Sequence, residues 1–334
     1  MASNLLENYI MITGQIYRSA KRVFTVKVDE SGQLVHATAL RELIKGREQH
    51  IVVGDKVALE RIVVGDKEEY HISEIFPRSN VIFRPSPREG RKKMLATNCD
   101  LMVIVFSAER PEYKRGLVDR YLVRSLEWGI PAILVFNKMD IYTPEDTELE
   151  INFIFEEERI KELNIKSFEV SALDKDYKNR FLTNGRNELK EILKNKTAIF
   201  MGQSGVGKSE LITSISEGAA MLRTSEIGKG GKGSHTTTWS EIIDCGEFTL
   251  IDSPGIRSFA LNDIQEEDLL LYFPDLTKYI SQCKFRNCTH EENAKGCSFQ
   301  QLDPTLKETQ YVLSRLQSYI KLDKEVSKRD PWNK

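Results

Sequence analysis

A glycine-rich segment that ends in lysine and serine carries the clearest chemical signal in the sequence. Residues 202–209 match the pattern GxxxxGKS and lie between an apolar stretch, predicted as a strand, and a stretch of helical character. Glycines let backbone N–H groups converge on a phosphate, and the N-terminus of the following helix adds partial positive charge there. We therefore predict a phosphate-binding loop formed by Gly202, Gln203, Ser204, Gly205, Val206, Gly207, Lys208 and Ser209.

The last two residues of this loop have chemical roles of their own. Lys208 is expected to contact the β- and γ-phosphates of a nucleotide and is our first candidate catalytic residue. The hydroxyl of Ser209 is expected to coordinate Mg²⁺.

Two motifs earlier in the chain predict which base is bound. Asn137-Lys138-Met-Asp140 ends a predicted buried strand, and the Asp140 carboxylate can accept hydrogen bonds from guanine N1–H and from its exocyclic amine. Adenine would leave that carboxylate unpaired, so the discrimination is large. Lys138 is expected to cover the ring and Asn137 to fix the loop. Ser171-Ala172, again after a strand, offers a backbone N–H to guanine O6.

Two further segments are candidates for sensing the γ-phosphate. Asp252-Ser-Pro-Gly255 fits DxxG, in which the aspartate holds Mg²⁺ through water and the glycine N–H meets the γ-phosphate. A glycine-rich stretch ahead of it ends in three threonines. We expect one of them to bind Mg²⁺, and the sequence leaves open which: Thr236, Thr237 or Thr238.

The residue after the DxxG motif differs from that of Ras-like enzymes, in which a glutamine there orients the attacking water. Ile256 cannot do so, and we expect slow unassisted hydrolysis. His235 is chemically suited to act as the base or the orienting group. A partner molecule is the alternative source of that group.

The order of the motifs is unusual. In GTPases of the usual order the phosphate loop comes first, whereas here both base-selecting motifs precede it. The strands can still form one sheet if the original ends are joined, which predicts a circularly permuted GTPase domain. Because DxxG then lies at the end of that domain, a movement driven by the γ-phosphate is expected to act on the segment that follows.

That following segment contains a compact set of metal ligands. Cys283, Cys288, His290 and Cys297 supply three thiolates and one imidazole within 15 residues. This is the ligand set of a closed, tetrahedral structural zinc site, which leaves no position for a catalytic water. Cys99 and Cys245 lie beside predicted strands, and we expect them in or near the core.

The remaining sequence divides the chain into parts. Residues 10–76 contain several short alternating strands, which predict a small barrel of the OB type, with a barrel of another class as the alternative. Strands then alternate with helices, which predicts a parallel sheet covered on both faces. We expect a multidomain chain with the following boundaries: an OB-type β-barrel (1–78), a basic linker (79–98), a circularly permuted α/β P-loop GTPase domain (99–260) and a mostly helical zinc-binding domain (261–334).

The composition is that of an ordinary soluble protein. The 334 residues are 40% hydrophobic and 29% charged, with a net charge of −2. We find no stretch of ~20 apolar residues and no signal peptide at the start, so we expect a cytoplasmic protein without membrane attachment. The bulk charge does not indicate a nucleic-acid partner, although 79–98 holds five basic residues against one acidic residue.

With these motifs in this order, the chain resembles the RsgA family of circularly permuted GTPases over nearly its whole length. The resemblance implies binding of GTP and GDP with Mg²⁺, one structural Zn²⁺, and hydrolysis stimulated by the small ribosomal subunit. It also implies a late role in the maturation of that subunit, with its ribosomal RNA as partner. A hydrophobic residue after the DxxG motif, such as Ile256, and the spacing of the four zinc ligands both match the family.

Two other functions remain open on the sequence alone. The chain could be a GTP-gated RNA-binding scaffold with negligible turnover, which Ile256 would allow. It could also act on translation more generally, with the barrel binding messenger RNA. We expect a monomer.

Overall fold

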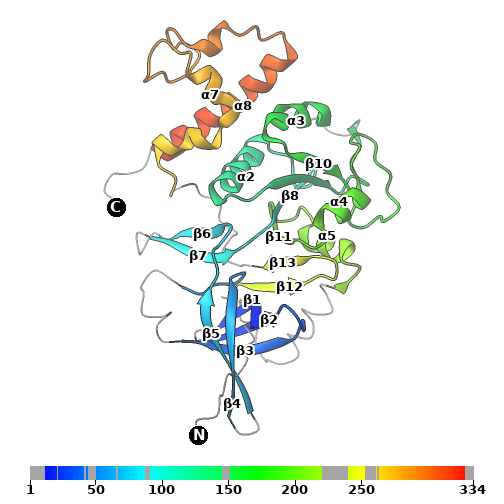
Figure 1. Cartoon of the computed structure of the whole chain (residues 1–334). Coiled ribbons are helices and arrows are strands. Elements are labelled where there is room, and N and C mark those ends of the chain that lie inside the picture. Colours follow the sequence, from blue (N-terminus) through cyan, green and yellow to red (C-terminus); the bar gives the residue numbers. More distant parts are fainter. Residues whose placement is uncertain are drawn as a thin grey trace.

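The computed structural model describes most of the chain in defined positions. The described residues are 12–20, 22–40, 43, 50–64, 67–86, 91–144, 151–219, 240–252, 261 and 263–327. Within them, three parts follow one another from the N-terminus to the C-terminus (Figure 1).

The N-terminal part is a closed barrel of five strands. The strands are β1 (Ile12–Ala20), β2 (Val23–Val28), β3 (Leu34–Ala39), β4 (Lys56–Val64) and β5 (Lys67–Ile75). They pair in the order β1-β2-β3-β5-β4, and β4 returns to β1, so the sheet closes on itself. Its interior is filled by apolar side chains from alternate positions, among them Ile16, Val26, Val57 and Ile72, each 0% exposed. The predicted barrel is confirmed.

The central part is an α/β domain with a six-stranded sheet. Its strands are β8 (Leu101–Ser107), β9 (Ala132–Asn137), β10 (Lys166–Glu169), β11 (Thr197–Met201), β12 (Glu241–Asp244) and β13 (Thr249–Asp252). The spatial order is β10-β9-β8-β11-β13-β12, and all neighbours are parallel except β12 and β13. The strand that carries the phosphate loop, β11, comes fourth among these strands in the chain, after β9 and β10, which precede the two base-selecting motifs. The predicted permuted sheet is confirmed.

Helices cover both faces of this sheet. They are α2 (Arg115–Trp128), α3 (Phe153–Ile160) with the short η2 (Lys161–Leu163), α4 (Arg186–Leu193) and α5 (Lys208–Ile215). Every residue of β8 is buried, because alternate side chains enter two separate cores. Met102 and Ile104 pack with α2, whereas Val103 and Val105 pack with α4 and α5. This explains why the strand is a continuous apolar run and not an alternating one.

The segment for which we expect a basic linker is instead a β-hairpin. Strands β6 (Val81–Ser86) and β7 (Arg91–Thr97) pair antiparallel and form a separate two-stranded sheet. The Val-Gly-Asp turn of the barrel anchors the end of this hairpin that lies away from the hairpin turn. Buried Asp55 accepts hydrogen bonds from Arg78 Nε (2.7 Å) and Thr97 Oγ1 (2.8 Å). Gly54 lies so close to the carbonyl oxygen of Thr97 that an added Cβ would be 2.0 Å from it, which excludes any other residue there.

Barrel and α/β domain share one continuous sheet. β1 pairs antiparallel with β12 at Arg18 and Glu241, which gives a sheet of eleven strands. Arg18 Nε also forms an ion pair with Glu241 (2.7 Å), and Lys27 Nζ forms one with Asp244 (3.3 Å). The sequence gives no signal for this pairing, because it joins strands more than 200 residues apart.

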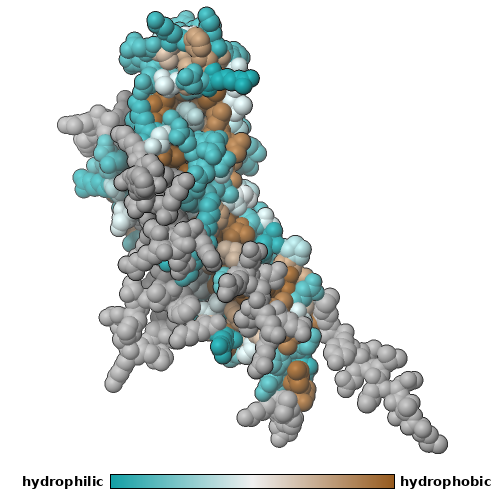
Figure 2. All heavy atoms as spheres, turned by 90° about the vertical axis from the view of Figure 1, so that its left-hand side faces the viewer, coloured by the Kyte–Doolittle hydropathy of each residue, from teal (hydrophilic) through white to brown (hydrophobic). Residues whose placement is uncertain are grey.

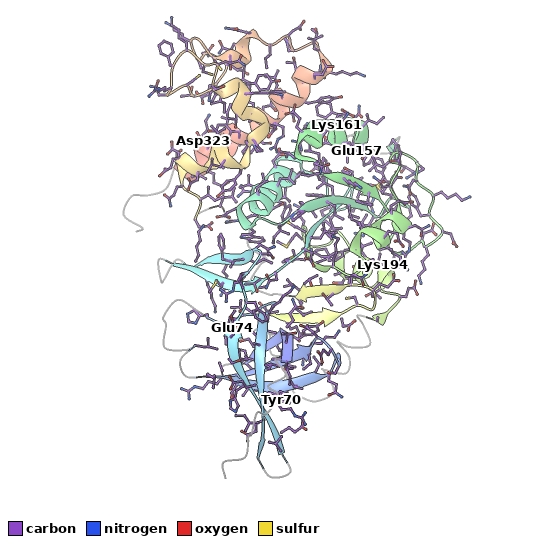
Figure 3. The ribbon with its side chains drawn as sticks, in the orientation of Figure 1. Tyr70, Glu74, Glu157, Lys161, Lys194 and Asp323 are labelled. Atoms are coloured by element: carbon purple, nitrogen blue, oxygen red, sulfur yellow. The ribbon has the colours of Figure 1, made fainter. Side chains whose placement is uncertain are left out.

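The C-terminal part is mostly helical. It contains η4 (Glu266–Tyr272), α7 (Pro274–Ile280), η5 (Ser298–Gln301) and α8 (Lys307–Ser327) around a small core that includes Leu269, Phe273 and Leu316. Asp323 of α8 is labelled in Figure 3. Burial and the nearby Glu266 raise its pKa. Figure 2 shows hydrophobic side chains in small patches among hydrophilic ones on the face that it presents.

A buried carboxylate joins this part to the α/β domain. Asp119 of α2 is 0% exposed and accepts hydrogen bonds from Arg159 of α3 (2.8 Å) and Arg315 of α8 (2.5 Å). Arg315 also pairs with Asp275 of α7 (2.8 Å). Burial opposes ionisation of Asp119, but the two guanidinium groups outweigh it and lower its pKa.

We expect Asp119→Asn to destabilise the protein by about 3–5 kcal/mol, because it leaves two buried arginines without their shared counter-charge. Urea unfolding followed by circular dichroism measures this, with Glu325→Gln, which removes the exposed partner of Arg120 at the same junction, as the control. The control should lose less than about 1 kcal/mol. Because folding lowers the pKa of Asp119, its contribution is present at neutral pH and should be lost in the wild type as the pH falls below about 4. An equal loss in both variants would contradict the assignment.

Candidate nucleotide-binding site and metal centre

The predicted phosphate loop connects β11 to α5, and two of its glycines are required by geometry. Gly202 has φ 147°, and an added Cβ would lie 2.2 Å from the carbonyl oxygen of Val105 on the neighbouring strand β8. Gly207 has φ 85°, and its Cβ would lie 2.5 Å from Asn137 Nδ2. Backbone and buried amide cannot move away, so larger residues are excluded at both positions.

The Lys208 ammonium group forms hydrogen bonds with backbone carbonyls of the phosphate loop. Its Nζ donates to the carbonyl oxygens of Gly202 (2.7 Å) and Gln203 (2.8 Å). The charge therefore lies within the turn of the loop, where phosphate oxygens are expected to bind.

One buried side chain links this loop to both base-selecting motifs. Asn137 is 0% exposed, and its Nδ2 donates to the carbonyl oxygens of Val206 (2.9 Å) and Gly207 (3.3 Å). Its Oδ1 accepts from the backbone N–H of Ala172 (2.9 Å). We predict that this same N–H meets guanine O6, and that contact requires the hydrogen bond to Asn137 to be shared.

The next residues place the other groups of the motif. Lys138 has φ 65°, in the left-handed region, and its Nζ donates to the carbonyl oxygens of Gly205 (2.6 Å) and Arg110 (2.9 Å). The side chain thus runs along the rim of the loop. Asp140 is exposed and lines the same pocket.

All of these groups line one open pocket of about 950 Å³. It brings together the following predicted residues: Asn137, Lys138, Asp140, Ala172, Gly202, Gln203, Ser204, Gly205, Gly207, Lys208, Ser209 and Asp252. Val206 is buried behind the loop, and Ser171 is buried, with its Oγ accepting from Asp174 N–H (2.9 Å). The volume lies within the range of sites that enclose small ligands.

Several predicted residues lie outside the described part of the chain. These are His235, Thr236, Thr237, Thr238, Gly255 and Ile256. Their assigned roles stay predictions.

Residues outside the recognised motifs also support the site. Glu169 lies two residues before Ser171, is 1% exposed, and accepts hydrogen bonds from the backbone N–H groups of Arg180 (3.0 Å), Phe181 (2.8 Å) and Leu182 (2.8 Å). The available signal was an acidic residue between the apolar residues Phe168 and Val170 at the end of a predicted strand, because a carboxylate that is buried there must have partners.

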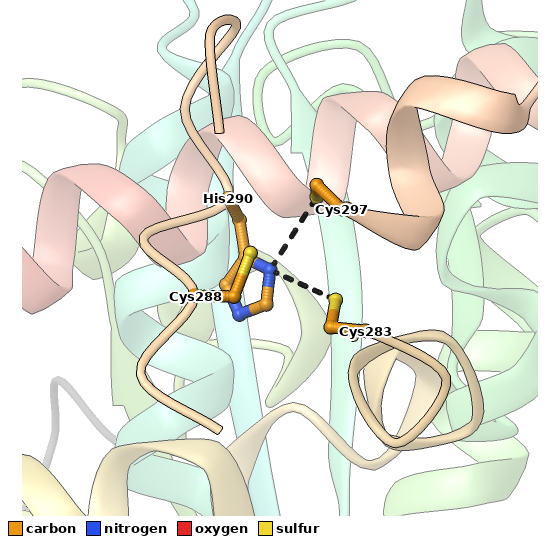
Figure 4. A group of neighbouring side chains, drawn as sticks. All are labelled: Cys283, Cys288, His290 and Cys297. Carbon is orange, nitrogen blue, oxygen red and sulfur yellow. Dashed lines mark hydrogen bonds between the residues drawn. The ribbon is translucent and has the colours of Figure 1, made fainter. Parts of the chain in front are cut away.

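The predicted metal ligands also come together. The ligand atoms of Cys283, Cys288, His290 and Cys297 all lie within 4.8 Å of one another (Figure 4). His290 Nδ1 lies 3.6 Å from Cys283 Sγ and 3.7 Å from Cys297 Sγ. Ligands at the bond lengths of a tetrahedral zinc site are separated by about 3.5–3.8 Å, so these two N···S distances fit the ion.

The protonation of these groups agrees with that fit. Hydrogen bonds from the hydroxyl and the backbone N–H of Ser298 lower the pKa of Cys283, although burial acts to raise it. Burial lowers the pKa of His290, which favours the neutral imidazole that metals bind. The described residues therefore suit a closed structural site.

These features define the class of the protein: a P-loop GTPase whose strands are circularly permuted, with an N-terminal barrel and a C-terminal Cys/His cluster. The model of the RsgA GTPase family matches residues 75–262. The chain belongs to the RsgA family of GTPases.

Individual relatives match over most of the chain. "Small ribosomal subunit biogenesis GTPase RsgA" of Flavobacterium psychrophilum is 32% identical, over 96% of this chain and 96% of the relative. The protein of the same name from Bacillus subtilis is 35% identical, over 84% of this chain and 85% of the relative.

Two solved structures are similar along almost their full length. The structure of YloQ, described as a circularly permuted GTPase, has a TM-score of 0.69 at 25% identity and covers 99% of both chains. YjeQ from Thermotoga maritima has a TM-score of 0.71, covers 96% of this chain and all of the other, and at 24% identity supports the fold.

Among the described helices, none has the length and apolar character needed to cross a membrane.

We expect Gly202→Ala to abolish measurable nucleotide binding while the protein stays folded, because the new Cβ meets the Val105 carbonyl. Fluorescence titration with a labelled GDP measures the binding, and circular dichroism checks the fold. Gly116→Ala is the control, since an added Cβ there meets no atom within 4 Å. Unchanged affinity in Gly202→Ala would show that the loop geometry is not that of the binding state.

We expect a zinc chelator, or Cys297→Ser, to release one zinc ion per chain and to unfold the C-terminal part, because the closed site contributes folding energy. Metal analysis and the helical signal at 222 nm measure this. Cys245→Ala, which changes a buried cysteine outside the cluster, should keep the full zinc content. Full helical signal after complete zinc removal would argue against a structural role.

Proposed function

We propose that the chain binds GTP with Mg²⁺ and hydrolyses it to GDP and phosphate as a step in assembly of the small ribosomal subunit. The observation that carries this proposal is the convergence of the NKMD motif, Ala172, the phosphate loop and Asp252 on one pocket, joined through the buried amide of Asn137.

The residues of the pocket have distinct roles in this proposal. Asp140 selects guanine, and Lys138 covers the base along its stem. Lys208 stabilises the negative charge that develops on the β- and γ-phosphates during transfer. Ser209 and Asp252 hold Mg²⁺, directly and through water, and the ion when bound offsets charge on the phosphates. One of Thr236, Thr237 and Thr238 completes the metal shell.

The attacking water needs an orienting group, because Ile256 replaces the glutamine of Ras-like enzymes. His235 is our candidate within the chain, and a group brought by the partner is the alternative. In both cases the partner is needed, either to order His235 or to bring its own group, so we expect a low rate of GTP hydrolysis for the protein alone.

The names of the relatives support the small ribosomal subunit as the partner. They are described as biogenesis GTPases of the small ribosomal subunit, and they cover most of this chain. Basic side chains suited to RNA phosphates lie on the β6–β7 hairpin, where Arg84 and Lys93 are exposed and directly paired across the strands. We propose ribosomal RNA of that subunit as the binding surface, and Zn²⁺ at the Cys/His cluster as a structural ion.

The test of this function is GTP turnover of the full chain with and without small ribosomal subunits. We expect subunits to raise the rate at least about tenfold by ordering the water-orienting group, and Lys208→Ala to lose the stimulated rate. Intact nucleotide binding with stimulation below about threefold would favour a GTP-gated RNA-binding scaffold instead.

The base preference has a separate test in Asp140→Asn. Xanthine carries a carbonyl where guanine carries the exocyclic amine, so the asparagine amide can donate to it while the carboxylate cannot. We expect the variant to bind GDP at least about tenfold more weakly and xanthosine diphosphate more tightly than the wild type. Competition against a labelled nucleotide measures both affinities. Unaltered preference in the variant would mean that Asp140 does not contact the base.

A further inference from the structure

The segment that follows the Ser-Ala motif contacts the loop that follows the NKMD motif. We propose that Arg180, in this segment, is a positioning residue that sets guanine specificity by holding the peptide next to Asp140. This inference rests on the guanine-nucleotide function proposed above.

The contacts of Arg180 with the base-selecting loop are direct. Its Nη2 donates to the carbonyl oxygen of Met139 (2.6 Å) and to that of Tyr142 (2.8 Å). The backbone N–H of Met139 donates to the carbonyl oxygen of Val170 (3.2 Å), and the Met139 side chain is buried. Both polar groups of Met139 are therefore held, and the peptide that leads into Asp140 is fixed from two sides.

Arg180 is in turn held in place by its own neighbours. Its guanidinium lies 5.1 Å from the centre of the Phe181 ring, and its Nε donates to the hydroxyl of Tyr177 (3.1 Å). The Tyr177 hydroxyl donates to Glu169 Oε1, and the same oxygen accepts the backbone N–H of Arg180 (3.0 Å). Buried Glu169, two residues before Ser171, thus fixes Arg180 against the strand that carries the second base-selecting motif.

The loop needs such support because regular structure ends before it. β9 ends at Asn137, and the left-handed conformation of Lys138 turns the chain sharply. Asp140 itself is exposed. Recognition of guanine requires both carboxylate oxygens to align with N1–H and with the exocyclic amine, and a small rotation of the loop loses one of these two hydrogen bonds.

Arg180 is exposed and lies outside the hydrophobic cores, so its removal should leave the fold intact. A role in stability alone would weaken binding of every nucleotide equally. A role in positioning Asp140 should weaken binding of GDP more than binding of inosine diphosphate, which keeps N1–H but lacks the exocyclic amine and so has one hydrogen bond fewer to lose. Comparison of GDP with inosine diphosphate therefore separates the two roles.

The experiment measures dissociation constants of GDP and inosine diphosphate with Mg²⁺ for the full chain, by competition against a labelled GDP. We expect Arg180→Ala to weaken binding of GDP about tenfold and binding of inosine diphosphate less than about threefold, so that the preference for GDP becomes smaller. Arg180→Lys should be intermediate, because an ammonium lacks the planar fork. Lys178→Ala, an exposed basic residue of the same segment, is the matched control and should behave as wild type.

Equal weakening of both nucleotides by Arg180→Ala, or no weakening of GDP, would overturn this inference and leave the proposed function standing. A wild type that does not prefer GDP over ADP would overturn the proposed function itself. That failure appears before any substitution is made, so the two outcomes are distinguishable.

Discussion

The nucleotide site depends on the hydrogen bonds of one buried amide. Asn137 donates to the carbonyl oxygens of Val206 and Gly207 and accepts from Ala172, so its side chain joins three loops that come from three strands. A carboxylate could not donate to the two carbonyls, and an apolar side chain would remove the hydrogen bonds that Asn137 forms with the Val206 carbonyl and the Ala172 N–H, which belong to buried residues. Asn137 therefore connects the phosphate loop to both base-selecting motifs, and Lys138 adds a second connection through its hydrogen bond to the Gly205 carbonyl oxygen.

The same domain is held firmly to its neighbours on two sides. The barrel continues its sheet through β1 and β12, with ion pairs alongside the backbone bonds. On the other side, Asp119 joins α2 to α3 and to the C-terminal α8 by buried charge pairs. In the sequence, the three candidate threonines lie shortly before β12, and the DxxG motif starts at Asp252, the last residue of β13.

Where sequence and structure differ, long-range contacts are the reason. The proline- and arginine-rich stretch 79–98 has the composition of a linker, yet it forms β6 and β7 because Asp55 and Gly54 of the barrel turn anchor its base. The Ser171-Ala172 motif was expected to offer a backbone N–H to guanine O6, and the structure shows that the N–H of Ala172 donates to Asn137 Oδ1. Neither partner is near in sequence, so composition and local pattern could not reveal the contact.

The sequence by itself predicted the barrel and the permuted α/β sheet, and it singled out the phosphate-loop motif, the base-selecting motifs and the Cys/His cluster, whose described residues the structure brings together. Strand and helix periodicity, glycine spacing and ligand spacing are local properties, and local sequence is sufficient to specify them. Only the tertiary structure decided that Arg180 and Glu169 support the base-selecting loop, that Asp119 joins three helices, and that β1 pairs with β12. These contacts bring together residues that the chain separates, and their energy comes from burial and charge pairing that exist only after folding.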